Sequence, residues 1–167
     1  MGRDKGLIVQ EGRTWAELAY DRLTGLCRSV YVSIRKEQLA QYNMFSPDAI
    51  VLDARADVEG PMRGILSAFD QKPADYLVLA CDLPRISASA LAALVEAAAN
   101  SDAECAAFET DRAEPLCAFY GQRALEELSL SVGNDFSLER FLRKRRTIFL
   151  PAGDFARELH NYNTPGP

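Results

Sequence analysis

Short apolar runs typical of β-strands alternate with segments of helical spacing along almost the whole chain. The clearest run, at 75–81, reads DYLVLAC and predicts a strand buried on both faces of a parallel sheet. Shorter runs predict further strands at 29–34, 49–53, 103–108, 116–120 and 147–150. This alternation indicates an α/β fold, with a mainly parallel sheet covered by helices on both faces.

The segments between these runs have helical patterns. Thr14 and Glu17 have the spacing of a capping box, and Ser87 is a typical N-cap. Helices are predicted at 14–27, 36–42, 62–69, 87–100, 122–130 and 137–144. At 167 residues, we expect the whole chain, 1–167, to form a single domain.

Composition excludes several classes of protein. The net charge of -5 argues against a general nucleic-acid binder, and no run approaches the roughly 18 apolar residues of a membrane span. The charged N-terminus is not that of a secretory signal. The four cysteines form no C-x-x-C pair and predict reduced core thiols in a cytoplasmic protein. With one histidine, His160, a zinc cluster is not expected.

The most concentrated basic stretch is the run from Arg143 to Arg146. It suits the last turn of a helix, where cations interact favourably with the helix dipole. Contact with an anionic ligand is the alternative.

In parallel sheets, ligands bind at the carboxyl ends of the strands, so the residues that follow each strand decide function. Asp82 follows the most apolar run and precedes Leu83-Pro84. A carboxylate there suits Mg²⁺, which usually takes one or two carboxylates together with phosphate oxygens. A turn or cap aspartate is the alternative.

Three other segments have possible functional roles. Gly60-Pro61 precedes a helix, whose first N–H groups could contact an anion, although glycine and proline open many helices. Lys5 lies among glycines and could neutralise phosphates, or belong to a frayed terminus. Asn161 and Asn163, before Thr-Pro, could direct amides to one side of an extended segment or form a capped turn.

These motifs occur in one order: M-G-R-D-K at the start, G-P-M-R-G-I-L-S-A, then C-D-L-P, and N-Y-N-T-P near the end. Together they resemble the molybdenum cofactor guanylyltransferase (MobA-like) family over essentially the whole chain. The resemblance implies a Rossmann-like, three-layer nucleotidyltransferase fold. It also implies an enzyme that transfers GMP from GTP to molybdopterin with Mg²⁺, releasing pyrophosphate and forming the guanine dinucleotide cofactor.

The resemblance also assigns roles to residues. Lys5 matches the phosphate-binding lysine, and Asp82 matches the aspartate that binds Mg²⁺ and GTP. Ser33, where the family often has asparagine, and Asp53 match nucleotide contacts, with Gly60 and Pro61 beside them. In the final motif Asn161 and Asn163 resemble a contact with the pterin substrate. Cytidylyltransferases favour aspartates in that motif, so the asparagines favour GTP.

One departure from the family is large. Its phosphate-binding motif reads L-x-G-G-x-S-x-R-M-G-x-D-K after an apolar strand, and this sequence begins at the methionine. We therefore expect the first strand and the Gly-Gly loop to be absent, which would expose a wide apolar groove in the sheet. Three explanations of this departure remain open: a start site placed too late, a chain made without its beginning, or a degenerate protein that no longer binds GTP. The sequence ends directly after N-T-P-G-P, and two interpretations are possible there: a second truncation, or the junction to a fused domain.

The expected partners are GTP and molybdopterin, with molybdoenzymes or other cofactor-biosynthesis proteins as further candidates, and the expected state is a monomer. Two alternatives to guanylyl transfer stay open. One is a related cytidylyltransferase or sugar-phosphate nucleotidyltransferase. The other is a degenerate, non-catalytic protein that binds a nucleotide or the cofactor.

Overall fold

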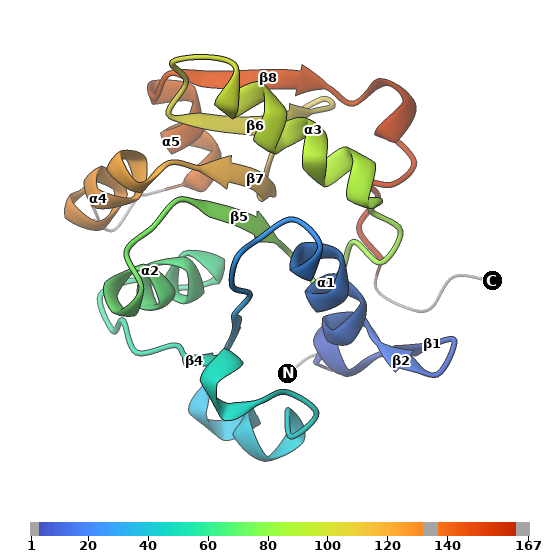
Figure 1. Cartoon of the computed structure of the whole chain (residues 1–167). Helices are drawn as coiled ribbons and strands as arrows, with labels where there is room; N and C mark the ends of the chain where they lie inside the picture. The colour runs from blue at the N-terminus through green and yellow to red at the C-terminus, as the bar shows by residue number, and fades with distance from the viewer. Residues whose placement is uncertain (1–3, 132–136, 163–167) are drawn as a thin grey trace.

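A computed structural model describes residues 4–131 and 137–162. Its elements alternate as expected for an α/β protein (Figure 1). The helices are α1 (Trp15–Thr24), α2 (Pro61–Gln71), α3 (Ala88–Ala99), α4 (Gln122–Leu130) and α5 (Leu138–Lys144). The strands are β1 (Val9–Gln10), β2 (Arg13–Thr14), β3 (Val32–Ile34), β4 (Ile50–Leu52), β5 (Tyr76–Leu79), β6 (Cys105–Glu109), β7 (Ala113–Tyr120) and β8 (Thr147–Pro151).

Local signals in the sequence explain several boundaries. The Thr14 side chain accepts from the Glu17 amide, and the Glu17 carboxylate accepts from the Thr14 amide, which confirms the capping box of α1. Ser87 caps α3 in the predicted way. The segment predicted as a helix at 36–42 is a 3₁₀ helix, Lys36–Gln41. The β1–β2 hairpin was not predicted, because its turn residues, Glu11 and Gly12, lack the usual Asn-Gly signal although both have positive φ.

The sheet is mixed and divided. The larger part has the strand order β5-β7-β6-β8, and a separate part pairs β3 with β4. The expected parallel arrangement holds for β3 with β4 and for β6 with β8. Strand β7 instead runs antiparallel to both of its neighbours. The turn between Glu109 and Ala113 is too short for the crossover that parallel pairing with β6 needs, and β5 runs in the same direction as β6.

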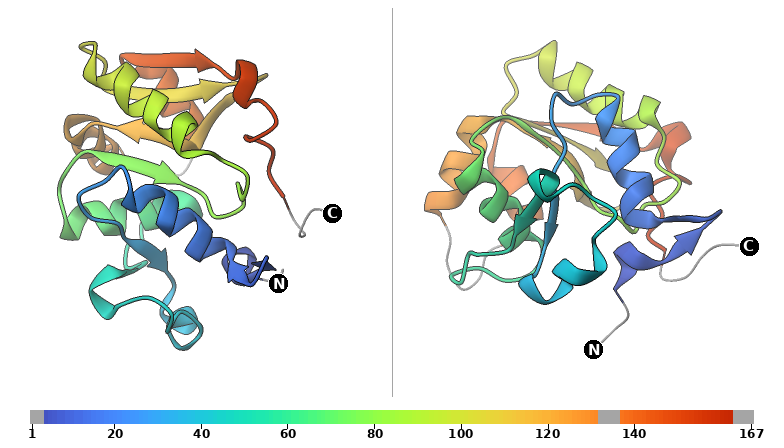
Figure 2. Two further views of the ribbon diagram at one scale, coloured as in Figure 1. Left: turned by 45° about the vertical axis from the view of Figure 1, so that its right-hand side comes forward. Right: turned by 60° about the horizontal axis from the view of Figure 1, so that its bottom comes forward.

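Helices cover both faces of the larger sheet, giving three layers (Figure 2). On one face α2, α4 and α5 bury a cluster that includes Leu66, Leu125 and Leu142. On the other face α3 buries Leu91 and Leu94 against β6 and β7. The expected three-layer α/β architecture is thus present. Within the described residues no helix has the length and apolar character needed to span a membrane.

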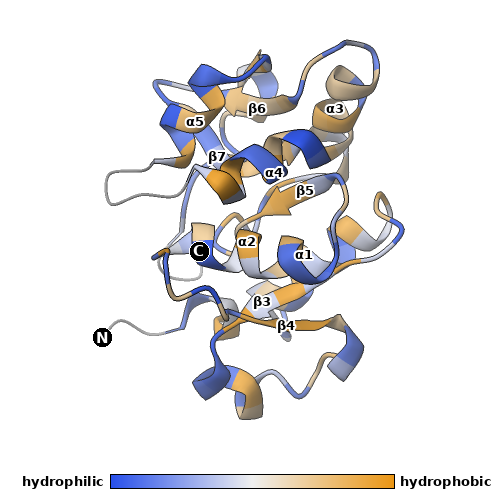
Figure 3. Ribbon diagram, turned by 90° about the vertical axis from the view of Figure 1, so that its left-hand side faces the viewer, coloured by the Kyte–Doolittle hydropathy of each residue, from blue (hydrophilic) through white to orange (hydrophobic). Residues whose placement is uncertain are grey.

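Strand β5 differs from its prediction. Its residues are strongly hydrophobic (Figure 3), yet all of them are only half-buried, so the expected burial on both faces is wrong. The reason is that β5 pairs with β7 along one edge, whereas a cavity of about 900 Å³ lies along its other side. Mostly apolar residues of α1, α2, β5 and the segment before β3 line this cavity, which we call the central groove. The apolar groove expected without the family's first strand is therefore present.

Candidate functional site

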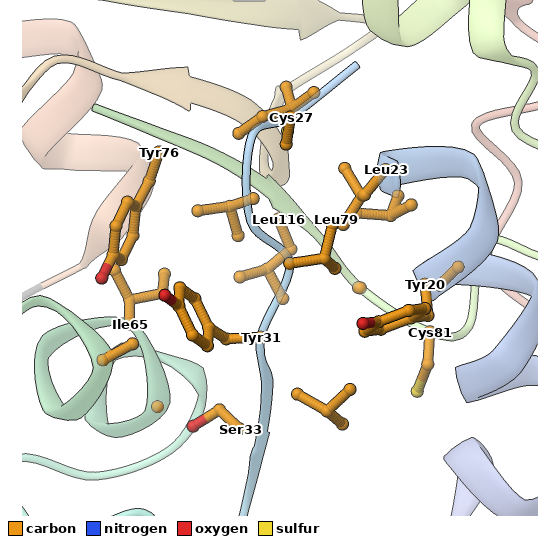
Figure 4. Close-up of a pocket in the computed structure, with 18 of the residues that line it drawn as sticks. Tyr20, Leu23, Cys27, Tyr31, Ser33, Ile65, Tyr76, Leu79, Cys81 and Leu116 are labelled. Carbon is orange, nitrogen blue, oxygen red and sulfur yellow. The ribbon is translucent and has the colours of Figure 1, made fainter. Parts of the chain in front are cut away.

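The central groove brings together most of the residues singled out from the sequence. Its lining includes Ser33, Asp53, Gly60, Pro61 and Asp82. Figure 4 shows how α1, the segment leading to β3, α2 and β5 surround it, with Ser33 and Cys81 on different elements. Residues separated by up to 49 positions thus line one cavity, which runs along the edge of β5. Ser33, Asp53 and Asp82 lie near the carboxyl ends of β3, β4 and β5, where an α/β sheet binds ligands.

Ser33 and Asp53 form one pair on the β3–β4 side of the groove. The Ser33 hydroxyl donates to Asp53 Oδ1 at 2.5 Å, because the parallel register of β3 and β4 places the ends of these strands side by side. Gly64 of α2 packs directly against the pair: a Cβ at this position would lie 2.9 Å from Ser33 Oγ. The glycine therefore lets the helix approach two polar groups at the site.

The turn that enters α2 has the geometry that its sequence predicts. Gly60 has a φ of 62°, which favours glycine, and Pro61 occupies the first turn of the helix. This turn and Asp53 also line a second, polar cavity of about 470 Å³. The other lining residues of this cavity are Arg35, Gln38, Glu59 and Arg63. Arg35 directly follows the strand predicted at 29–34, where a ligand contact is expected. Gln38, Glu59 and Arg63 were not predicted, although Glu59 and Arg63 flank the Gly60-Pro61 turn.

Lys5 and Asp82 form the second pair of the site. Lys5 Nζ lies 2.8 Å from Asp82 Oδ2, and the lysine and aspartate side chains are 39% and 19% exposed. The groups come from segments 77 positions apart, so tertiary structure and not local geometry makes this contact. It places a cation beside an anion of the groove lining, and both side chains are partly exposed.

The loop that carries Asp82 is held from two directions. Arg22 of α1 donates to the Pro84 carbonyl at 2.5 Å, and the Tyr162 amide donates to the Asp82 carbonyl at 3.0 Å. The Arg85 guanidinium also lies over the Tyr162 ring. The C-terminal segment therefore reaches the site, with Asn161 exposed beside this contact; Asn163 lies outside the described residues.

One carboxyl group and one thiol near Asp82 have shifted pKa values. Burial, with the negative charge of Asp82, raises the pKa of Glu114 at the start of β7. Burial raises the pKa of Cys81 to about 11, so this thiol stays protonated. The cysteines are free, as expected, but only Cys105 and Cys117 are core residues, because Cys27 and Cys81 are half-buried along the groove.

The fit of a metal ion rests on Asp82. Among residues 4–131 and 137–162, no group of three acidic, histidine or cysteine side chains is arranged to hold a metal. Magnesium nevertheless fits, since it needs only one or two protein carboxylates when phosphates and waters complete its shell. The open Asp82 carboxylate, with Lys5 to balance phosphate charge, meets this requirement.

The three arginines of the basic run at 143–146 form ion pairs within the protein. Arg143 pairs with Glu109 at 2.7 Å, Arg145 pairs with Glu127, and Arg146 pairs with Asp102 at 3.0 Å. The helix-end interpretation fits Arg143, which lies in the last turn of α5. The alternative, contact with an anionic ligand, has no support from these pairings.

Comparisons with known proteins agree with this geometry. Residues 1–148 match the family model of the MobA-like NTP transferase domain. The molybdenum cofactor guanylyltransferase of Pseudomonas putida GB-1 is 27% identical over 166 residues, which cover 98% of this chain and 86% of that protein. The molybdenum cofactor biosynthesis bifunctional protein of Synechocystis is 34% identical over 130 residues, covering 75% of this chain but only 37% of that longer protein.

A solved structure gives the same result for the fold. The crystal structure of molybdopterin-guanine dinucleotide biosynthesis protein A from Archaeoglobus fulgidus superposes with a TM-score of 0.77 at 23% identity. The match covers 98% of this chain and 86% of that one. At this identity the similarity establishes the architecture, including the layers that surround the groove.

Proposed function

Since this chain belongs to the MobA-like NTP transferase family, we propose that it transfers the guanylyl group of GTP to molybdopterin. Relatives that align with 98% of this chain, and of which it covers 86% and 80%, are named molybdenum cofactor guanylyltransferases. The observation that carries the proposal is the Lys5–Asp82 pair facing the Ser33–Asp53 pair across one groove. This arrangement offers separate contacts for the phosphates and for the nucleoside.

The reaction needs no nucleophile from the protein. A phosphate oxygen of molybdopterin forms the new bond to the α-phosphorus of GTP, while the bond to the bridging oxygen breaks and pyrophosphate leaves with the electron pair. The protein therefore contributes positioning and electrostatic stabilisation. Lys5 would balance the charge that grows on the leaving pyrophosphate, and Ser33 with Asp53 would orient the nucleoside.

We further propose that Asp82 holds Mg²⁺. When bound, the ion would neutralise phosphate charge and polarise the phosphoryl group. The role of Lys5 beside Asp82 is then to keep the carboxylate oriented before the nucleotide arrives. Asn161 and Asn163 would contact the pterin substrate; in support, the amide of Tyr162, which lies between them in the sequence, donates to the Asp82 carbonyl. We expect a cytoplasmic monomer, with molybdoenzymes or other cofactor-biosynthesis proteins receiving the product.

The test is pyrophosphate release from GTP in the presence of molybdopterin and Mg²⁺. We expect activity with GTP, a strong loss in Asp82→Ala, and little change in Arg146→Ala, whose ion pairs lie far from the groove. Activity that is unchanged in Asp82→Ala would refute the metal assignment. Release from CTP but not GTP would indicate the related cytidylyltransferase.

A thermal-shift titration separates an enzyme from a non-catalytic relative. Binding to the folded state raises the melting temperature by mass action. We expect GTP with Mg²⁺ to stabilise the chain. No response to any nucleotide would support a non-catalytic protein and contradict the proposal.

A further inference from the structure

The Asp4 carboxylate, which the proposed reaction does not use, is held by three donors. Its Oδ1 accepts from the Gly6 amide and from the Tyr42 hydroxyl, both at 3.0 Å. Its Oδ2 accepts from the Gln38 side-chain amide at 2.5 Å. Two of these donors lie more than thirty positions along the chain, in and just after the 3₁₀ helix Lys36–Gln41. Hydrogen bonds to a charged group are the stronger kind, so Asp4 is fixed tightly.

Asp4 directly precedes Lys5, so its fixed position also fixes the backbone from which the Lys5 side chain extends. Asp4 is the N-cap of the 3₁₀ helix Lys5–Leu7, and Gly6 inside that helix is buried against Tyr42. A Cβ on Gly6 would lie 2.2 Å from the Tyr42 hydroxyl oxygen, so the turn lies directly against this residue. From this base the Lys5 side chain reaches Asp82.

Gln38 links the same carboxylate to the polar cavity. Its side-chain oxygen accepts from the Arg35 amide at 2.9 Å while its nitrogen donates to Asp4. Arg35 and Gln38 both line the cavity that contains Asp53 and Gly60. One side chain therefore connects the nucleoside side of the site with the segment that carries Lys5.

We propose that Asp4, Gln38 and Tyr42 form a positioning cluster, which sets Lys5 against Asp82 before a nucleotide binds. The cluster deepens the proposed function, because Lys5 acts there on the phosphates. The Tyr42 hydroxyl is the part of the cluster that packing alone does not explain. The ring is buried and stacks on Phe45, which a phenylalanine would also do, so the hydroxyl serves the hydrogen bond to Asp4.

The first test measures the freedom of Lys5 without any nucleotide. An amine-acetylating N-hydroxysuccinimide ester is added in limited amount, and the rate at each lysine is read by peptide mass spectrometry. Loss of one hydrogen bond to the carboxylate in Tyr42→Phe should raise the rate at Lys5 by about threefold to tenfold. Exposed Lys144, in the last turn of α5, serves as the internal reference, and its rate should not change.

Tyr76→Phe is the matched control, since it also removes a tyrosine hydroxyl from the lining of the groove, but one that donates to the Lys72 carbonyl and not to Asp4. It should leave the rate at Lys5 unchanged. Gln38→Met, which keeps the length but removes the donor, is the second variant and should act as Tyr42→Phe does. An unchanged Lys5 rate in both Tyr42→Phe and Gln38→Met would overturn the proposal.

The second test separates positioning from general damage through a double-mutant cycle. Tyr42→Phe should lower kcat for pyrophosphate release by about tenfold with little change in KM, because Lys5 is expected to act on the leaving group. In a Lys5→Met background, the same substitution should have no further effect. Equal losses in both backgrounds would overturn the proposal. If the unaltered chain releases no pyrophosphate, the proposed function fails, and the acetylation rates still decide the role of the cluster.

Discussion

The close approach of α2 to Ser33 and Asp53, the proposed nucleotide contacts, makes Gly64→Ala an informative substitution. The new methyl would lie 2.9 Å from Ser33 Oγ, 3.2 Å from Ser33 Cβ and 3.4 Å from Asp53 Oδ1. The hydroxyl can rotate away, but then it leaves Asp53, and its Cβ still requires a small shift of the helix. The substitution should therefore disturb the Ser33–Asp53 pair without opening the core.

Two opposing effects set the stability of this variant. Replacing glycine by alanine inside a helix stabilises by up to about 1 kcal/mol. Loss of the Ser33–Asp53 hydrogen bond costs about 0.5–1.5 kcal/mol, at the lower end because Ser33 is exposed. The free energy of unfolding should therefore change by less than about 1 kcal/mol. GTP affinity should fall about tenfold, because an orienting contact is misplaced.

Urea unfolding and calorimetric titration with GTP and Mg²⁺ measure these two quantities. Gly25→Ala is the matched control, since a Cβ there meets nothing within 4 Å and its φ of -74° suits alanine. It should leave GTP affinity unchanged. A Gly64→Ala protein that gains about 1 kcal/mol and binds GTP as before would refute the reasoning, since the site would then tolerate the methyl.

Three more substitutions test other parts of the site. Asp82→Asn keeps an acceptor for Lys5 but removes the charge, and should lower pyrophosphate release on the order of 100-fold; normal turnover would contradict its role. Arg22→Met removes the hydrogen bond to the Pro84 carbonyl and should lower the free energy of unfolding in urea by about 1 kcal/mol, with an unchanged value counting against this anchor. Burial and then Asp82 raise the pKa of Glu114 in the folded protein, so its contribution is most favourable at low pH and is lost as pH rises through that pKa. The melting temperature of Glu114→Gln, relative to that of the unaltered chain, should therefore increase from pH 4 to pH 7. A difference that stays constant over this range would contradict the reasoning.

The sequence was most informative where a local rule decides structure. Caps at Thr14 and Ser87 and the Gly60-Pro61 turn are set by neighbouring residues, and the structure has them as predicted. The apolar run at 75–81 correctly predicted a strand. Its half-burial could not be predicted from the run itself, because burial depends on which elements lie beside β5.

The site shows the same limit. The residue types at Asp53 and Asp82 suggested ligand contacts, but the sequence could not show that Asp53 pairs with Ser33 or Asp82 with Lys5. These pairs depend on strand register and on contacts across the groove. The missed residue Gln38 has the least local signal, since its role appears only when Asp4 comes into reach from 34 positions away.

The division of the sheet gives the bound nucleotide a mechanical role. In the described residues β3 and β5 belong to different sheets, so no ladder of backbone hydrogen bonds fixes the Ser33–Asp53 side relative to the Asp82 side. This separation is held instead by the packing of α1 and α2 and by single side-chain contacts to the Asp82 loop, those of Lys5 and Arg22. A nucleotide that contacts both sides would then link the two parts of the sheet and restrict their relative motion. Its binding should stiffen the whole molecule, slowing amide hydrogen exchange in both β4 and β5 together.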